Sequence, residues 1–454
     1  MLRSSYIWTI QSDLDIIKFP YNKLHTPGYN TPDHIERGND MKKLITFLLV
    51  LTIIVSMTAC AGSAATTAAT TAATTKAGTT AGSSAGTTAA ATTAASNKYD
   101  KANKIIIGCV TSLTGERAQN GVYTKEALDM WVEEVNAKGG ILGKKVEIAY
   151  EDDQSTDQGG ANAYQKLMSR GDVNAAIAPV FSSIVLALEP YIKQYEIPTF
   201  TAGSSVKMAT LKNPYLWQIR YNDALAGSTM AKAALNTLKM KKPVIIHESD
   251  SFGQGLADAT RAELIKMGMK NEDIIGFTYN KGEKNFAPAI AIMKEKGCDG
   301  IIAVSQQIEA SLIMMQVKAS GLTVPKIGST SYCSEIAIKN AEAAADDWYS
   351  VSDWSPTVTT PEGKAFVDAY KAKYKKDPDL PSSTNYDSVQ LIKKAIEMAN
   401  SVEPKAINAQ ISKINGVKGV ASTYTPNADH ICATTQFLTK NIGGKAIIQE
   451  TVSR

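Results

Sequence analysis

Two serine-containing segments, Ser182-Ser183 and Gly203-Ser204-Ser205, each follow an apolar segment typical of a buried strand and stand at or before the start of a helix. At the first turn of a helix, backbone N–H groups have no partner within the helix, and a serine hydroxyl adds a further polar group there. Such a helix start binds anions well. The two segments therefore predict a seat for a ligand carboxylate. The alternative is that Ser182 and Ser205 serve only as helix N-caps, although one residue can fill both roles.

The elements that must position these serines follow an alternating pattern. Short apolar or alternating segments predict strands at residues 104–111, 145–150, 175–180, 198–202, 243–247, 274–279, 300–304 and 326–328. Helical periodicity lies between them, at residues 123–137, 160–170, 184–195, 255–267 and 309–320. Strands that alternate with helices predict βαβ units and parallel sheets, an α/β fold. Because the alternation starts again after residue 240, we expect two similar lobes, with a ligand cleft at the carboxyl ends of their strands.

Residues 41–60 have the layout of a secretory signal. Two lysines precede an apolar stretch, residues 44–55, which is shorter than the roughly 20 residues of a membrane-spanning helix. The segment closes with Met-Thr-Ala-Cys and so resembles the lipobox of bacterial lipoproteins, in which the cysteine, here Cys60, carries a diacylglycerol and becomes the first residue. The alternative is a plain signal or an uncleaved anchor. Either way, we expect the rest of the chain to act outside the cytoplasm.

The segments on either side of this signal are unusual. Residues 1–40 place a polar stretch before the lysines, whereas a signal peptide begins with its charges. We therefore predict that residues 1–40 are not translated, which a peptide recovered from this region would contradict. Residues 61–96 consist almost wholly of Ala, Thr, Gly and Ser. This composition predicts a flexible stalk with a reach of about 30 to 35 Å.

The charge and the cysteines exclude several kinds of partner. The formal net charge of +4 arises from 48 basic and 44 acidic side chains spread along the chain. With no basic run, nucleic acid is not an expected partner. Four cysteines follow Cys60, namely Cys109, Cys298, Cys333 and Cys432. None belongs to a C-x-x-C pair or stands at metal-ligand spacing from a histidine, so no metal or cofactor is expected, and one or two disulfides remain open.

Catalytic motifs are lacking. The chain contains no G-x-x-x-x-G-K-[ST], no H-E-x-x-H and no plausible nucleophilic triad. His247 lies on an expected strand, where a satisfied buried imidazole is a better interpretation than a general base. The pair Asp152-Asp153 lies at an expected turn and is interpreted as solvated capping residues. We therefore expect a protein that is not an enzyme, with an extracellular enzyme on the same fold as the weakest alternative.

Several segments carry a family resemblance that covers the whole folded region. They are GCVTSLTGERAQNG (108–121), NAKGGILGKKVEI (136–148), the acidic turn EDD (151–153), FSSIVLALEPYIKQYEIP (181–198), HESDSFGQG (247–255) and KASGL (318–322). Together they resemble the branched-chain amino-acid-binding proteins, which are type I periplasmic binding proteins of ABC importers. The resemblance implies two Rossmann-like lobes joined by a three-crossover hinge. The first lobe would comprise residues 97–221 and about 355–425, and the second residues 222–354 and about 426–454. A helix would open at residues 385–387.

The resemblance also implies a function. Such a protein captures a small molecule by closing its lobes, and the closed form docks on an ABC permease. A separate subunit of the importer hydrolyses ATP. We expect a monomer, lipid-anchored through Cys60 on the outer face of the membrane of a Gram-positive cell. The alternative is a ligand-sensing receptor domain of the same fold. No helix-turn-helix precedes the lobes, and no apolar span follows them in this sequence.

Ligand contacts in the first lobe follow from the same resemblance. It implies that Ser182 binds a ligand carboxylate, that the Gly203 carbonyl accepts from a ligand ammonium, and that Ser205 adds a hydroxyl. Asn120 takes the place of a family tyrosine at the edge of the cleft.

The second lobe departs from the family pattern. Phe252 corresponds to an aromatic side chain that flanks the ligand, Gln306 (or Gln307) to a tyrosine, and Thr330 to the acid that pairs with the ligand ammonium. Because a buried ammonium without a carboxylate is costly, either Asp250 or Asp353 takes the missing role or the ligand is not an ordinary α-amino acid. An amide, a short carboxylate or an aromatic acid would suit Gln306, Thr330 and Tyr332.

Overall fold

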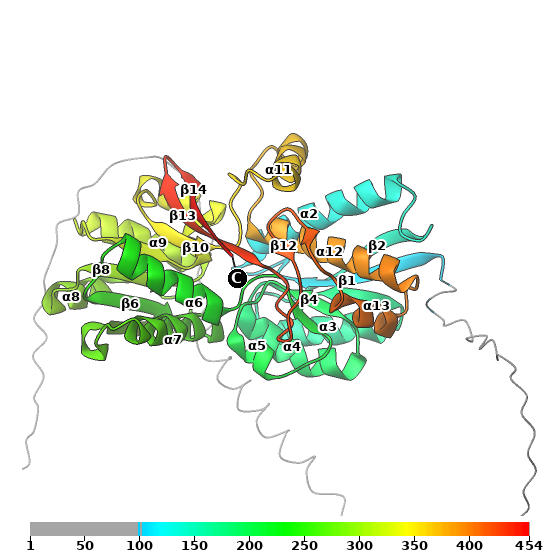
Figure 1. Ribbon diagram of the computed structural model, residues 1–454, viewed down its shortest axis with the longest axis horizontal. Helices are drawn as coiled ribbons and strands as arrows, with labels where there is room; N and C mark the ends of the chain where they lie inside the picture. The colour runs from blue at the N-terminus through cyan, green and yellow to red at the C-terminus, as the bar shows by residue number, and fades with distance from the viewer. Residues whose placement is uncertain (1–98, 100–101, 454) are drawn as a thin grey trace, which may run out of the picture. The chain divides into compact units, whose positions relative to one another are not determined.

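The computed structural model describes Tyr99 and residues 102–453. The expected signal, the lipidation at Cys60, residues 1–40 and the stalk at 61–96 all lie outside the described residues. Figure 1 shows the described part as two lobes, each with a sheet between layers of helices. Among the described residues, no helix is long and apolar enough to cross a membrane.

The first lobe is built on a five-stranded parallel sheet with the strand order β2-β1-β3-β4-β5. The strands are β1 (Lys104–Thr111), β2 (Lys145–Asp152), β3 (Val173–Ile177), β4 (Thr199–Thr201) and β5 (Leu216–Gln218). Four helices come from the first part of the chain: α2 (Ala118–Ala137), α3 (Asp157–Ser169), α4 (Ser182–Tyr195) and α5 (Val206–Thr210). Three more come from later in the chain and belong to the same lobe: α11 (Pro361–Tyr374), α12 (Leu380–Ala399) and α13 (Pro404–Ile411). A short hairpin, β11 (Val417–Lys418) and β12 (Thr423–Tyr424), follows α13.

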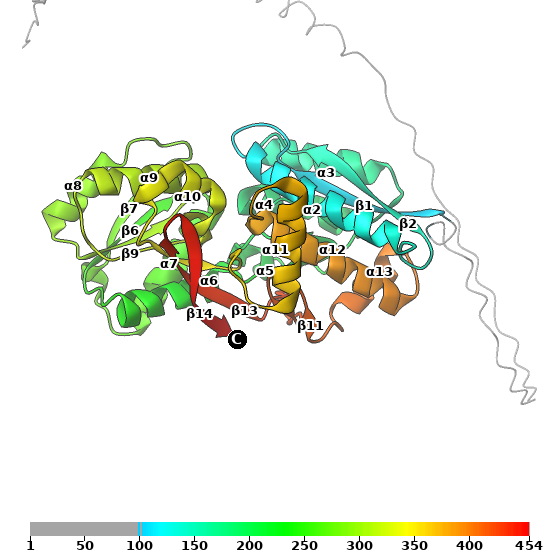
Figure 2. The ribbon, with the colours of Figure 1, turned by 90° about the horizontal axis from the view of Figure 1, so that it is seen from above.

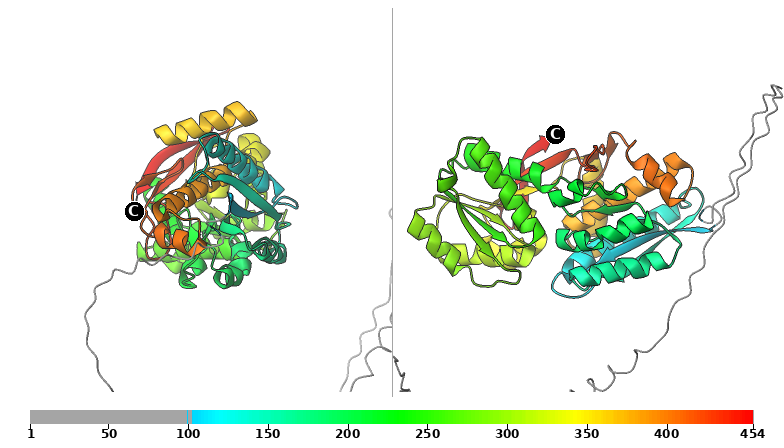
Figure 3. Two further views of the ribbon diagram at one scale, coloured as in Figure 1. Left: turned by 90° about the vertical axis from the view of Figure 1, so that its right-hand side faces the viewer. Right: turned by 90° about the horizontal axis from the view of Figure 1, so that it is seen from below.

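Side chains of β1 alternate between two apolar layers. Ile105, Ile107 and Cys109 pack with α2, α12 and α13, whereas Ile106 and Val110 pack with α3 and α4. Figure 1 shows these helix groups on opposite faces of the sheet, and Figure 3 shows α11 outside the first group. Both faces of a parallel sheet are covered in this way, which explains why the strand reads as an almost continuous apolar run.

The second lobe contains a seven-stranded sheet with the order β14-β13-β10-β9-β8-β6-β7. Its parallel strands are β6 (Pro243–Glu248), β7 (Ile275–Tyr279), β8 (Gly300–Val304), β9 (Lys326–Gly328) and β10 (Tyr349–Ser352), and the antiparallel pair is β13 (Thr435–Ile442) and β14 (Lys445–Ser453). Helices α6 (Asp223–Lys232) and α7 (Ser251–Lys266) cover one face, and α8 (Ala287–Lys296), α9 (Gln307–Ala319) and α10 (Glu335–Ala341) cover the other. Short helical turns are η1 (Ala233–Thr237), η2 (Asn271–Asp273), η3 (Thr330–Cys333) and η4 (Glu342–Ala344).

The chain crosses between the lobes three times, after β5, after β10 and before β13. Two contacts join these crossings. The Nε of Arg220 lies 2.6 Å from Oδ2 of Asp353, and the Tyr221 hydroxyl donates to the Thr434 carbonyl at 2.8 Å. Figure 2 shows β13 extending between the two lobes. The α/β fold with a three-crossover hinge is therefore confirmed.

All eight expected strands form, although α2 and α7 begin earlier than expected and β3 ends earlier, and two boundaries implied by the resemblance are wrong. Residues 385–387 do not open a helix, because α12 already begins at Leu380, with the Asp379 carboxylate accepting from the Leu380 N–H at 2.8 Å. The segment before β13 stays with the first lobe, where Ile431 bridges to Gln218 and the His430 ring stacks on Trp217. The chain therefore returns to the second lobe at β13 and not near residue 426.

Candidate ligand-binding site

The structure brings the two serine segments of the first lobe together. The Ser182 Oγ accepts hydrogen bonds from the backbone N–H groups of Ser204 and Ser205, each at 3.1 Å, and all three residues are buried. Ser183 beside them is half-buried. Ser182 is the first residue of α4, so its hydroxyl joins the two strand-to-helix junctions. The hydrogen of the Ser182 hydroxyl can still be donated to a ligand carboxylate. The carboxylate contact at Ser182 stays a prediction.

Two further first-lobe groups already have partners. Ser205 is the N-cap of α5, and its Oγ accepts from the Lys207 N–H at 3.4 Å. The Gly203 carbonyl accepts from Nε2 of Gln218 at 3.0 Å, which leaves one of its two lone pairs for a ligand. The helix-capping alternative therefore describes Ser205 well, and its ligand contact stays a prediction.

A cavity of about 390 Å³ lies between the lobes, at the carboxyl ends of several parallel strands. The first lobe contributes Glu116, Arg117 and Asn120, and the second lobe contributes Glu248, Lys281 and Gln306, among others. Glu248 is the last residue of β6, and Gln306 stands directly before α9. Open parallel sheets bind ligands at this edge, so the cavity lies where the fold predicts a ligand.

The lobes touch across this cavity. Nε2 of Gln307 donates to Oδ1 of Asn120 at 3.0 Å, and Nζ of Lys281 lies 2.6 Å from Oε1 of Glu116. The Tyr123 hydroxyl adds a third contact, to Oε2 of Glu335, at 2.9 Å. The structure thus shows an arrangement in which both lobes contribute polar groups to one cavity.

Charged groups dominate this cavity. Glu248 has a fully buried side chain, and burial, with the nearby charges of Asp250 and Glu309, raises its pKa to about 8. Arg117 is also buried, and its guanidinium stacks 4.1 Å from the centre of the Phe181 ring, next to the serine junction. Neither residue was predicted from the sequence. An acid that directly follows an apolar strand was the available signal for Glu248.

Asn120 and Gln306 are the predicted ligand residues that line the cavity. Thr330 begins η3, where its hydroxyl lies 3.1 Å from that of Ser352. Phe252 is buried in the apolar cluster around α6 and α7.

Tyr332 is not among the residues that line this cavity, and its contact with the ligand stays a prediction. Its ring is fully buried in the second-lobe core, stacked 4.7 Å from Trp348, and its hydroxyl accepts from Ser305 Oγ at 3.1 Å. The tight turn of η3 directs this side chain inward, which a linear sequence does not reveal.

The two acids expected to replace the missing carboxylate are already engaged. Oδ1 of Asp250 accepts from the Gly253 N–H at 2.6 Å as the N-cap of α7, and Asp353 pairs with Arg220. His247 has partners at both ring nitrogens, the Glu248 carbonyl and the Thr278 hydroxyl, each at 3.0 Å, as a satisfied buried imidazole would.

The four cysteines within the described residues are free thiols. In the same part of the chain, no group of three or more His, Cys, Asp or Glu side chains could hold a metal ion.

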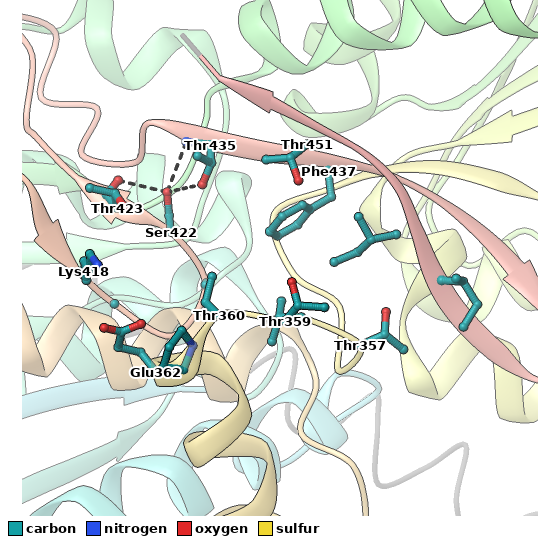
Figure 4. A pocket seen from close by; sticks show the side chains of 16 residues that line it. Thr357, Thr359, Thr360, Glu362, Lys418, Ser422, Thr423, Thr435, Phe437 and Thr451 are labelled. Atoms are coloured by element: carbon teal, nitrogen blue, oxygen red, sulfur yellow. Dashed lines mark hydrogen bonds between the residues drawn. The ribbon is translucent and has the colours of Figure 1, made fainter.

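A second cavity, of about 480 Å³, lies beside the hinge, between the start of α11 and the β13–β14 pair (Figure 4). Hydroxyl and apolar side chains line it, among them Thr357, Thr360, Ser422, Thr435, Phe437 and Thr451. The Ser422 hydroxyl lies 2.7 Å from that of Thr435. Although this cavity is larger than the one between the lobes, it is not at the carboxyl ends of parallel strands, and no predicted ligand residue lines it.

The fold and the position of the cavity between the lobes define a two-lobed solute-binding protein. A family model described as periplasmic binding protein matches residues 104–441, so the chain belongs to this family. The Leu/Ile/Val-binding protein BraC3 of Rhizobium johnstonii is 27% identical over 309 residues, which cover 66% of this chain and 80% of that protein. An amino acid binding protein of Pseudomonas aeruginosa is 26% identical over 302 residues, covering 66% of this chain and 80% of that protein.

Solved structures agree with this assignment. The branched-chain amino acid transporter substrate-binding protein LivJ of Streptococcus pneumoniae, in complex with isoleucine, has a TM-score of 0.70 and 25% identity, and the match covers 77% of this chain and all of that chain. The leucine-binding protein LivK of Thermotoga maritima has a TM-score of 0.72 and 21% identity, covering 77% of this chain and 99% of that chain. The resemblance to the branched-chain amino-acid-binding family is confirmed.

Proposed function

We propose that this protein is the extracellular solute-binding subunit of an ABC importer. It captures a small ligand (an amino acid, an amide or a short carboxylate) between its lobes, acts as a monomer and delivers the ligand to a permease. The observation that carries this proposal is the cavity to which both lobes contribute, in a chain that matches the family over residues 104–441. Relatives named for binding leucine, isoleucine or valine support the ligand range.

Closure is the mechanism that this arrangement supports. Each lobe supplies part of the cavity lining, so a ligand between them contacts both and stabilises the closed arrangement by its higher affinity for that arrangement. The contacts Asn120–Gln307 and Glu116–Lys281 then form as the lobes meet. A permease that recognises the closed arrangement would distinguish loaded from empty protein.

A thermal-shift screen tests the proposal directly. The mature chain without its lipidated cysteine, residues 61–454, is heated with amino acids, amides, short carboxylates and aromatic acids. A ligand present at 100 times its dissociation constant should stabilise the protein by about 2.7 kcal/mol. A screen without any stabilising compound would count against solute binding in this range, and chemical turnover of a bound compound would favour an enzyme.

We also propose that a lipid on Cys60 tethers the protein to the outer face of the membrane. The support is the sequence of residues 41–60, which closes with a cysteine after small or mid-sized residues. Cys60→Ala should release the protein from the membrane fraction into the medium. Retention of the variant on the membrane would show that another segment anchors it.

A further inference from the structure

Glu248 is a buried carboxylate without a partner. Its side chain is 0% exposed, and neither carboxylate oxygen accepts a hydrogen bond from any described residue. It stands at the carboxyl end of β6 and lines the cavity between the lobes. Because a buried charge without compensation is costly, folding stability alone does not account for this residue.

The cations near Glu248 are directed to other partners. Nζ of Lys281 pairs with Glu116 at 2.6 Å, and the Arg117 guanidinium stacks on Phe181. Two acids, Asp250 and Glu309, add negative charge near Glu248. Among the described residues, no ion pair reaches the Glu248 carboxylate, so the cavity has an uncompensated acid at its wall.

We propose that Glu248 holds a cationic nitrogen of the ligand. This inference rests on the proposed function and narrows its ligand class to small molecules that carry an amine, amino acids included. Glu248 would thereby replace the acid that is missing at Thr330, from a different strand of the same lobe. The amides of Asn120 and Gln306 line the same cavity and offer uncharged donors and acceptors to the rest of the ligand.

Proton linkage supports this assignment. Burial and the neighbouring acids raise the pKa of Glu248 to about 8, whereas Arg117 and Lys281 lower it. At pH 7 the carboxyl group is therefore mostly protonated in the empty cavity. An ammonium beside it favours the ionised form, so binding of an amine should release a proton to the buffer.

The experiment compares matched pairs of probes that differ in one amino group. The pairs are L-leucine with 4-methylpentanoate and L-glutamine with 5-amino-5-oxopentanoate. Affinity and proton release are measured by titration calorimetry of the mature chain at pH 7, in two buffers of different ionisation enthalpy. We expect the amine of at least one pair to bind with proton release, and its partner to bind at least thirtyfold more weakly.

Substitutions of single residues show which side chain causes the preference for the probe that carries an amino group. Glu248→Gln keeps the shape and removes the charge, and should weaken amine binding on the order of thirtyfold and abolish proton release. Glu248→Asp should keep part of the amine affinity and part of the proton release. Asp223→Asn is the matched comparison, because Asp223 is equally buried and without a partner for its carboxylate oxygens but is not among the residues lining the cavity. Glu272→Gln, at an exposed position of the same lobe, controls for net charge.

Each outcome decides between the two proposals. Equal binding of both members of a pair, unchanged by Glu248→Gln, would overturn the role of Glu248 and leave solute binding intact. Loss of the preference in Asp223→Asn alone would assign the ammonium to that residue instead. No binding of any probe to the wild-type chain would count against both. Circular dichroism and the unfolding temperature of Glu248→Gln show whether a loss of binding reflects unfolding.

Discussion

Arg220 and Asp353 form an ion pair, with 2.6 Å between Nε and Oδ2, at the point where two of the three interlobe crossings lie side by side. The exposed fractions of the two side chains are 8% and 4%. Oδ1 of Asp353 also accepts a hydrogen bond from the Tyr221 N–H at 3.4 Å. The pair therefore links two of the crossings, and its removal should affect both stability and the motion of the lobes.

Asp353→Asn should destabilise the protein by about 3 to 5 kcal/mol, because it leaves the Arg220 guanidinium buried without its counter-charge. Urea unfolding at pH 7 measures the change. The control is Glu397→Gln, which breaks the partly exposed pair with Lys393 on α12 and should cost about 0.5 kcal/mol or less. Equal effects of the two substitutions would contradict a special role of the hinge pair.

Glu248→Gln should change how stability depends on pH. The carboxyl pKa is about 8 in the folded protein and ordinary, 4.5, in the unfolded chain. The folded state therefore keeps its proton while the unfolded chain loses it, so stability is full below pH 4.5 and falls as the pH rises to 8. The glutamine variant lacks this loss. Its stability relative to the wild type should rise by on the order of 3 kcal/mol from pH 4.5 to pH 8, measured by unfolding at both pH values.

Ser182→Ala should lower stability and disturb the first-lobe ligand seat. The hydroxyl accepts from two buried backbone N–H groups, those of Ser204 and Ser205, and alanine leaves both without this acceptor. We expect a loss of about 1 to 3 kcal/mol in the free energy of unfolding. Ser183→Ala, at the half-buried neighbouring position, is the control and should change stability by less than about 0.5 kcal/mol.

Asn120→Ala should favour an open arrangement of the lobes. Its side-chain amide joins α2 to Gln307 of α9 across the cavity, so the variant loses a contact that exists only when the lobes meet. Small-angle X-ray scattering of the ligand-free variant should show a larger radius of gyration than the wild type. The control Gln158→Ala alters an exposed amide on α3 that contacts only its own helix through Asn162, and should leave the radius unchanged.

Tyr332→Phe separates a core role from a ligand role. The tyrosine hydroxyl accepts from Ser305 within the second-lobe core, so its removal should cost about 1 kcal/mol of stability and leave ligand affinity unchanged. Titration of the best compound from the thermal-shift screen measures the affinity. An affinity loss of tenfold or more without a loss of stability would return Tyr332 to the binding site.

Much of the fold followed from local patterns. Apolar β-branched stretches such as 104–111 and the helical periods between them predicted two α/β lobes, because a parallel sheet covered on both faces requires that pattern. Helix boundaries followed less closely from the sequence. The start of α12 is marked by Asp379 as its cap and by a proline in its first turn, whereas the prediction placed the start at residues 385–387.

Residue types and strand ends determined the α/β fold and the serines at two helix starts of the first lobe, and they predicted export. The tertiary structure alone decided which polar side chains share a space. It placed Tyr332 in the core, engaged Asp353 at the hinge and left Glu248 without a partner at the cavity wall. The physical reason is that burial and pairing arise between residues far apart in the chain, so no local pattern records which charge remains uncompensated.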